Sequence, residues 1–401
     1  MRPRNAKRNT PEVDRLIGLC LALYASGSRV EDRFWEERID AMIDAALNGG
    51  RQTMLDAALD ELQRNHPLVY GTLADMTETR SESFRASRGE EGEWDTLLVA
   101  VPILAWTRYE IPSGPIGDER RQSLLTQLHA HVVASDARLA LAPFLYSIDQ
   151  LPRHHVETFQ LAQKLAQAAL QGRQPKLAGD RGEATAPILA DPRFLIAAVA
   201  APVGKPLFRW QEGDGDVRTA RRRTLDNWVA QGGNALITLF PGCEIECLLP
   251  DAFHAACREA DERIRPHTVR TAVTHLTETL GVDASTLRAV IGGFGEQRID
   301  EYRIAFTRRG SNDVLYGVVW PLYGRESGEV AEEDGGEARS PLDEIGVLLR
   351  DMGVNDIRRH AGRHEPEFCD DCGTPLYLDP NAEIVHPEMP DDAVSTPSHF
   401  H

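Results

Sequence analysis

Cysteine is scarce in this chain, which has six among its 401 residues. So few thiols in a chain of this length do not form a disulfide framework, and two of them, Cys369 and Cys372, stand in a Cys-x-x-Cys motif, which indicates a reducing compartment. Long apolar runs are also lacking, so no stretch is expected to span a membrane. The apolar run after the basic N-terminal residues imitates a signal peptide, but Thr10-Pro11-Glu12 has the features of a helix start. We therefore expect a cytoplasmic protein.

Basic residues are outnumbered by acidic ones. The chain has 44 Lys and Arg against 62 Asp and Glu, for a net charge of −18. An average surface of this charge repels a phosphate backbone, so nucleic acid is not expected as the main partner. The run Arg221-Arg222-Arg223 is a local basic patch, and it keeps an RNA-associated role open as a third hypothesis.

Local catalytic motifs are missing as well. The sequence has no Gly-x-Ser-x-Gly elbow, no Walker lysine motif and no His-Glu-x-x-His. The glycine-rich stretch 292–295 joins two predicted strands and does not open a helix, so it does not fit a phosphate-binding loop. A triad assembled from distant positions would escape such a scan. The sequence therefore does not decide whether the protein is an enzyme.

The patterns that are present predict a helical N-terminal subdomain followed by units of strands and helices. Apolar residues recur at helical spacing from Pro11 to about Arg88, which predicts a helical N-terminal subdomain. Two apolar runs that end in proline, at 96–103 and 194–203, predict buried strands, and each is followed by a loop, a helix, a strand and a helix. We predict an α/β fold, with a mixed α+β fold as the alternative.

The two strand-loop-helix-strand-helix units suggest an internal duplication. Sliding the sequence by 98 residues lays Leu239 on Leu141 and Pro241 on Pro143, and a slide of 100 lays Pro202 on Pro102. Within the second unit, residues 235–245 are predicted to form a buried strand, and Cys243, Cys247 and Cys257 are predicted to pack in the core. The predicted divisions are a helical subdomain at 1–93, repeats at 94–172 and 191–265 around a linker at 173–190, a C-terminal α/β unit at 266–360 and a tail at 361–401.

Two helices are predicted in the C-terminal part, in addition to the one that begins at Pro250. One runs from about Thr268 to Leu280, and the other begins with Ser340 as its N-cap and Pro341 at its first position.

Two further patterns concern the C-terminal part. Tyr302, Ile304 and Phe306 alternate with Arg303, Ala305 and Thr307, which predicts a hairpin strand with one solvent-exposed face. The composition from Asp379 onward predicts disorder in the tail.

The loops after the proline-ended strands are the predicted small-molecule site. In an open α/β sheet, ligands bind beyond the carboxyl ends of the strands. Each loop offers an aromatic ring, a guanidinium and a carboxylate, a set that suits stacking and recognition of an anion. The alternative is that the aromatic residues pack the loops and the charges pair in solvent. The residues are Trp106, Arg108 and Glu110 in the first loop and Arg209, Trp210 and Glu212 in the second.

The tail carries half of a predicted zinc site. Cys369 and Cys372, with Gly373 directly after them, can place two thiolates on one ion, and a tetrahedral site needs two more ligands. The alternatives are a reduced thiol pair on a flexible tail and a redox dithiol. The candidate ligands are His360 and His364 upstream, or His386 with Glu388 downstream.

The chain resembles an uncharacterised betaproteobacterial family, domain of unknown function 2863. The likeness covers nearly the whole length, from Val13-Asp-Arg-Leu16 and Phe34-Trp35-Glu36-Glu37 to the Cys369-Asp-Asp-Cys372-Gly373 tail with its His386-Pro-Glu388-Met389-Pro390 segment. The resemblance implies a bacterial cytoplasmic protein of unknown role and brings no catalytic residues.

Two main functional hypotheses follow. The first is a binding or interaction protein with an unknown protein partner and a small zinc-ribbon-like tail stabilised by zinc. The second is an enzyme or small-molecule sensor with an anion-recognising site between the repeats. The sequence does not determine the oligomeric state.

Overall fold

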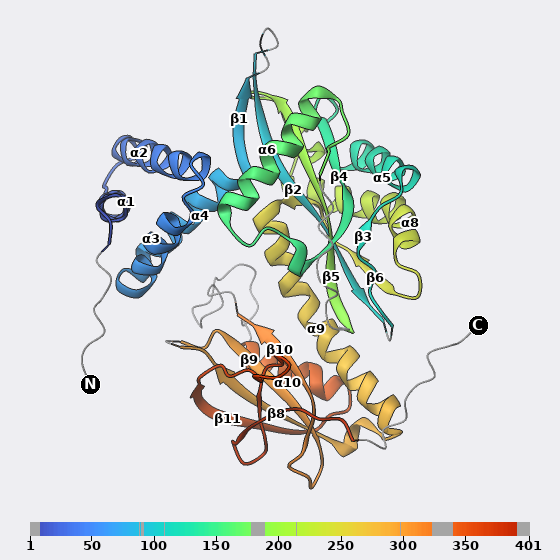
Figure 1. Cartoon of the computed structure of the whole chain (residues 1–401). Coiled ribbons are helices and arrows are strands. Elements are labelled where there is room, and N and C mark those ends of the chain that lie inside the picture. The colour runs from blue at the N-terminus through green and yellow to red at the C-terminus, as the bar shows by residue number, and fades with distance from the viewer. Residues whose placement is uncertain are drawn as a thin grey trace.

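The described part of the chain contains two larger β-sheets joined by one long helix, a group of helices at the N-terminal end and a small two-stranded sheet near the C-terminal end (Figure 1). The computed structural model describes residues 9–87, 89, 92–107, 109–177, 189–213, 215–296, 298–322 and 340–390. Along these residues, no helix has the length and apolar content needed to cross a membrane.

The N-terminal helices confirm the predicted helical start of the chain. The Thr10 side chain accepts a hydrogen bond from the backbone of Val13, and a proline occupies the first turn, so the first helix begins as predicted. The apolar faces of these helices share one core with Val156 and Phe159 of α6 (His155–Gln171), which attaches the group to the larger sheet. The helices are α1 (Pro11–Tyr24), α2 (Arg29–Asn48), α3 (Gln52–Asn65) and α4 (Pro67–Glu82).

The larger sheet is antiparallel in every pairing of its described strands. β2 and β5 lie side by side at its centre; β4 pairs with the outer side of β5, while β1, β6 and β7 pair with β2. The prediction of an α/β fold is therefore wrong, and the alternative, a mixed α+β fold, is confirmed. The strands are β1 (Ser83–Ser87), β2 (Glu93–Trp106), β3 (Gly114–Pro115), β4 (Arg138–Ser147), β5 (Ala190–Pro202), β6 (Glu244–Cys247) and β7 (Asp251–Ala252).

Both faces of this sheet are covered by helices. Odd-numbered residues of β2 such as Val101 and Ile103 pack under α5 (Asp118–His131), α7 (Val217–Asn227) and α8 (Gly233–Leu236). Even-numbered residues such as Leu98 and Leu104 pack under α6 and α9 (Phe253–Leu280). Burial on both faces explains why these strands read as continuous apolar runs.

The predicted strand at 235–245 is wrong. Residues 235–239 are helical, and a short strand begins only at Glu244. Leu236, Leu239 and Phe240 are buried at helical spacing, and Gly242 has a φ of +76° that interrupts the chain just before the strand. The region aligned with them upstream forms strand β4, so the proposed repeat partners differ in secondary structure here. The internal duplication stays a prediction.

The long helix α9 belongs to both halves of the molecule. The sequence predicted two helices here, but one helix continues through Pro266. Its first half buries Ala256 and Ala260 against the larger sheet, and its second half buries Ala272 and Leu276 against the second sheet.

The second sheet has the order β10-β9-β8-β11, with β11 parallel to β8 and the other pairs antiparallel. The predicted hairpin is confirmed as β9 and β10. One face of this sheet packs against the second half of α9 and against α10. The N-cap of α10, Ser340, was also predicted from the sequence. The elements are β8 (Leu287–Phe294), β9 (Glu301–Arg308), β10 (Val314–Pro321), α10 (Pro341–Asp351) and β11 (Asp356–His364).

The other face of the second sheet, predicted to be exposed, is buried. Arg303 is 1% exposed and Ala305 and Thr307 are 0% exposed. The chain returns over this face and forms the small hairpin of β12 (Tyr377–Leu378) and β13 (Ile384–Val385), which packs on it. The prediction of disorder from Asp379 is therefore wrong as far as Pro390, and residues 391–401 lie outside the described residues.

Candidate functional site

The two predicted ligand-binding loops lie at opposite ends of the larger sheet. β2 and β5 are antiparallel, and Trp106 at the end of β2 pairs with Ala190 at the start of β5, whereas Pro202 pairs with Trp94. At about 3.4 Å per residue, the two loops begin roughly 40 Å apart. They therefore do not form one site, and the strand-end rule that predicted one applies to parallel sheets.

The second loop is used for packing. Arg209 donates a hydrogen bond to the carbonyl oxygen of His129 at 3.1 Å, and Trp210 is buried and stacks on Phe208 with ring centroids 4.2 Å apart. Glu212 accepts hydrogen bonds from the backbone and the hydroxyl of Ser135, at 2.7 and 2.6 Å. These interactions match the packing alternative for this loop.

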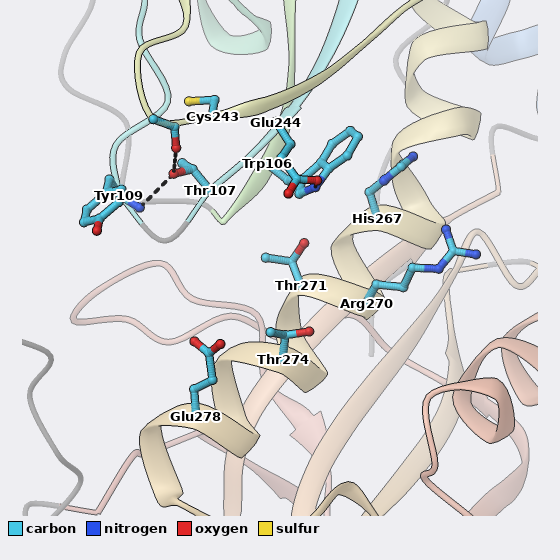
Figure 2. Close-up of a pocket in the computed structure, with 11 residues that line it drawn as sticks. Trp106, Thr107, Tyr109, Cys243, Glu244, His267, Arg270, Thr271, Thr274 and Glu278 are labelled. Carbon is cyan, nitrogen blue, oxygen red and sulfur yellow. Dashed lines mark hydrogen bonds between the residues drawn. The ribbon is translucent and has the colours of Figure 1, made fainter.

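The first loop borders a cavity. Trp106 lines a cavity of about 720 Å³ between the end of β2 and the helix α9, together with Tyr109, His267 and Arg270 (Figure 2). Glu110 is exposed. Arg108 lies outside the described residues.

The cysteines upstream of the tail are not brought together as ligands. Cys247 and Cys257 sit in the apolar layers on opposite faces of the larger sheet, where burial raises the pKa of Cys247 to about 11 and also raises that of Cys257. Cys243 is half-buried and lines the cavity beside Trp106. A thiol with a raised pKa is a poor nucleophile and a poor metal ligand at neutral pH.

The Cys-x-x-Cys motif forms a tight hairpin on the second sheet. The backbone N–H of Cys369 donates to Thr374 at 2.9 Å, and the N–H of Gly373 donates to the carbonyl oxygen of Cys369 at 2.8 Å. Gly373 has a φ of +73°, a conformation that favours glycine and lets the chain turn back directly after Cys372.

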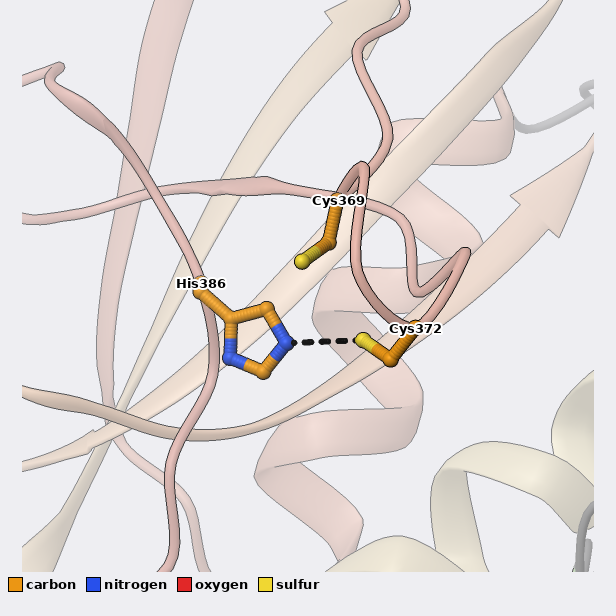
Figure 3. Close-up of side chains that lie close together, drawn as sticks. All are labelled: Cys369, Cys372 and His386. Carbon is orange, nitrogen blue, oxygen red and sulfur yellow. Dashed lines mark hydrogen bonds between the residues drawn. The ribbon is translucent and has the colours of Figure 1, made fainter.

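His386 completes a group of three metal-ligand side chains with these cysteines. It comes directly after β13, and its Nε2 atom lies 3.2 Å from Sγ of Cys372 (Figure 3). The ligand atoms of Cys369, Cys372 and His386 all lie within 4.8 Å of one another. Two sulfurs and one nitrogen on a tetrahedral zinc ion stand roughly 3.5–3.8 Å apart, so the group fits such an ion with small side-chain movements.

The charge state of the group also suits a metal. Contacts with Thr374 and His386 lower the pKa of Cys372 to about 6, so its thiolate predominates at neutral pH. The same contact with Cys372 raises the pKa of His386, whose ring must release that proton when Nε2 binds a metal. Oε1 of the exposed Glu388 lies 3.8 Å from the opposite ring nitrogen of His386, Nδ1, which is too far for a hydrogen bond.

The upstream histidines lie outside this group. Nε2 of His360 is 3.0 Å from the carbonyl oxygen of Asp379, and the His364 ring packs near Phe294 with ring centroids 5.5 Å apart. Both belong to β11, the strand that pairs with β8 at one edge of the second sheet, and neither has a ligand atom in the group formed by Cys369, Cys372 and His386. Of the sequence candidates, the downstream histidine is the one that the fold brings to the cysteines.

Sequence reasoning missed the residue that holds the cysteine hairpin. The guanidinium of Arg303 donates to the carbonyl oxygens of Glu367 and Leu376, at 2.7 and 2.6 Å, on the two sides of the hairpin. Its Nε donates to Glu301 at 2.6 Å, and its guanidinium lies 4.4 Å from the ring centre of Phe294. Arg303 therefore fixes both ends of the hairpin to β9. The alternating pattern of the strand predicted that Arg303 faces solvent, and no local signal marks this residue as buried.

Comparison with known proteins places the chain in a family but assigns no role. A family model described as a protein of unknown function, DUF2863, matches residues 1–400. No curated protein and no solved structure matches the chain.

Proposed function

The chain belongs to the DUF2863 family of proteins of unknown function, and we propose that it is a binding protein whose C-terminal segment is stabilised by zinc. The observation that carries this proposal is the convergence of Cys369, Cys372 and His386. Two thiolates and an imidazole favour zinc over magnesium or calcium, which prefer oxygen ligands.

The ion would link two parts of the C-terminal segment that lie on either side of the β12–β13 hairpin in the sequence. The cysteine hairpin comes before β12 and His386 comes after β13, so one ion would close the segment between them. Closing such a loop removes conformational freedom from the unfolded chain, and the binding energy of the metal then contributes to folding.

A partner surface lies beside this group. Phe368 is 54% exposed although it is a large apolar residue, and Asp370 and Asp371 next to it are exposed. Because the described residues supply three ligands, the fourth position of a tetrahedral ion would fall to water or to a donor from the partner. We infer a protein partner that presents an apolar contact with basic residues around it.

Metal analysis of untagged protein tests the proposal. We expect about one zinc per chain in wild-type protein and in the controls His360→Asn and Cys243→Ser, and loss of zinc in Cys369→Ser and His386→Asn. Metal-free wild-type protein of normal stability would overturn the proposal. Zinc that is retained in both ligand variants would overturn the assignment of the site.

A small-molecule role remains the second candidate function, and the cavity beside Trp106 favours it. A nucleic-acid role has less support, because two of the three arginines in the basic patch form ion pairs within the chain. Arg221 pairs with Asp251, and Arg222 lies 3.2 Å from Asp226.

A further inference from the structure

The two thiols of the metal group lie on one tight turn. The hydrogen bond from the N–H of Gly373 to the carbonyl oxygen of Cys369, at 2.8 Å, closes this turn, and Cys372 is its last residue. Residues three apart in such a turn have Cα atoms less than about 7 Å apart, the range in which two cysteines can form a disulfide. Both cysteines are free, and their Sγ atoms lie within 4.8 Å of each other (Figure 3). Side-chain rotation can therefore bring the sulfurs together with little movement of the backbone.

The base of the turn is fixed without the cysteine side chains. The N–H of Leu376 donates to the carbonyl oxygen of Glu367 at 3.0 Å, and Arg303 donates to the carbonyl oxygens of the same two residues. Phe368 and Pro375 form a β-bridge next to them. A bond between the two sulfurs would leave these contacts in place, so the turn can close at its tip while its base stays on the sheet.

An oxidant in solvent can reach this pair. Cys372 is exposed and Cys369 is half-buried, whereas Cys20 and Cys247 are buried. The four cysteines outside the turn pack in the cores of the N-terminal helices and of the larger sheet. Each thiol of the pair therefore has the other as its partner for a disulfide.

We propose that Cys369 and Cys372 form a reversible redox switch, in which a peroxide joins their sulfurs in a disulfide and removes two of the three ligands of the metal group. The consequence for zinc rests on the proposed function. His386 lies on another segment and would be the one ligand of the group that remains. Because structural zinc sites use four ligands, a single imidazole would not retain the ion.

One peroxide molecule balances the oxidation. The sulfur of Cys372 attacks one oxygen of hydrogen peroxide, the O–O bond breaks, and the sulfur becomes a sulfenic acid while the other oxygen leaves as water. The sulfur of Cys369 then attacks the sulfenic sulfur, so the S–S bond forms, the S–O bond breaks and the second oxygen leaves as water. Two thiols lose two electrons and two protons, and the peroxide is reduced to two waters. A dithiol reductant reverses the oxidation by thiol–disulfide exchange.

Thiol titration and zinc release, measured on the same sample of the full chain, test the proposal. With hydrogen peroxide, we expect the thiols titrated in denatured wild-type protein to fall from six to four. A metal-sensitive dye should detect about one released zinc per chain in parallel. Mass mapping should place the new disulfide between Cys369 and Cys372, and dithiothreitol should restore both thiols. Cys243→Ser is the control, and it should lose the same two thiols and release the same amount of zinc.

His386→Asn separates the switch from the metal. This variant keeps both thiols of the turn, so peroxide should form the same disulfide although the variant holds no zinc. Wild-type protein that contains no zinc but forms the disulfide would refute the proposed function and support the thiol pair. The switch is refuted if both thiols stay free after peroxide treatment, if the disulfide joins another cysteine, or if zinc stays bound after the disulfide has formed.

Discussion

A buried polar cluster joins the N-terminal helices to α9. Oγ of Ser81 donates to the carbonyl oxygen of Glu78 at 2.7 Å and lies 2.9 Å from Nε2 of His254. The carboxylate of Glu82 accepts the backbone N–H of His254, at 2.9 Å, in the first turn of α9. The Ser81 hydroxyl thus contacts both the Glu78 carbonyl oxygen and Nε2 of His254, which links α4 to α9.

Burial shifts the pKa values of Glu82 and His254 in opposite directions. It raises the pKa of Glu82 from 4.5 to about 7 and lowers the pKa of His254 from 6.5 to about 3. The raised pKa means that the folded chain holds the Glu82 proton more tightly than the unfolded chain, so this contribution to stability is lost as pH rises from about 4.5 to 7. The His254 contribution is lost as pH falls from about 6.5 to 3.

Glu82→Gln should remove the first of these pH dependences. The amide is uncharged at every pH, so the stability of the variant relative to wild type should increase by roughly 1–3 kcal/mol between pH 5 and pH 8. Urea denaturation at several pH values measures this difference. The exposed Glu12→Gln is the control, with a constant difference from wild type, and a constant difference for the Glu82 variant would contradict the prediction.

Two glycines on the second sheet leave the space that the C-terminal hairpin fills. A Cβ atom on Gly317 would lie 2.2 Å from Cζ of Tyr377, and one on Gly292 would lie 2.3 Å from Cδ1 of Leu378. Contacts this short do not occur between real atoms, so a side chain at either position would push the hairpin away from the sheet.

Gly317→Ala should lower the free energy of unfolding by about 1–3 kcal/mol, because it overpacks the contact with Tyr377. Gly18→Ala is the matched control. Nothing lies within 4 Å of a Cβ at that helical position, so alanine there should stabilise the protein by up to about 1 kcal/mol. Thermal unfolding of both variants compares the signs of the two stability changes. A Gly317 variant with wild-type stability would show that the hairpin does not pack closely on the sheet.

At the scale of elements, Arg303 links β9 to the cysteine hairpin. Arg303→Met keeps the length of the side chain but leaves the carboxylate of Glu301 and two backbone carbonyls without their donor. Removing one member of a buried ion pair costs about 3–5 kcal/mol, and we expect a loss of stability of this order together with weaker zinc retention.

Urea denaturation and metal analysis of the same preparation measure both effects. The control is Arg308→Met on the same strand, which is exposed and should change stability by less than about 0.5 kcal/mol. An Arg303 variant that retains both wild-type stability and zinc would contradict the role assigned to this residue.

Elements were predictable where their signals are local. The starts of α1 and α10 were predicted because an N-cap and a first-turn proline lie within a few residues of each other. The helical residues 235–239 were predicted as part of a strand, because a short apolar run fits a buried strand and a buried helical turn equally well. The buried face of β9 was also missed, because the segment that covers it comes more than 60 residues later, as the contact of Arg303 with Glu367 shows.

Only part of the candidate metal group was predictable from local sequence. Cys369 and Cys372 were identified from their own spacing, but only the fold selects His386 over His360 and His364. The ligand-binding prediction failed to bring its two loops together for a topological reason, since antiparallel pairing separates loops that a parallel sheet would have gathered.

At the scale of the whole molecule, the C-terminal segment is packed separately from the larger sheet. Tyr377 and Leu378 form a small apolar cluster with the second sheet, and the N–H of Glu388 donates to the carbonyl oxygen of Val314 at 2.8 Å. The central strands β2 and β5 contribute to other clusters, connected to this one through α9 and the second sheet. Loosening of the segment should therefore stay local.

Removal of the proposed zinc ion by a chelator tests this separation. Without the ion, the segment from Glu367 to Pro390 keeps only the small cluster and its hydrogen bonds, so its amide hydrogens should exchange at least about tenfold faster, which corresponds to about 1.4 kcal/mol of lost local stability. Amides of β2, β5 and the N-terminal helices should keep their protection, and His386→Asn should reproduce the metal-free pattern without chelator. Faster exchange throughout the chain would mean that the metal group stabilises the whole fold, because α9 would then transmit the loss from the second sheet to the first.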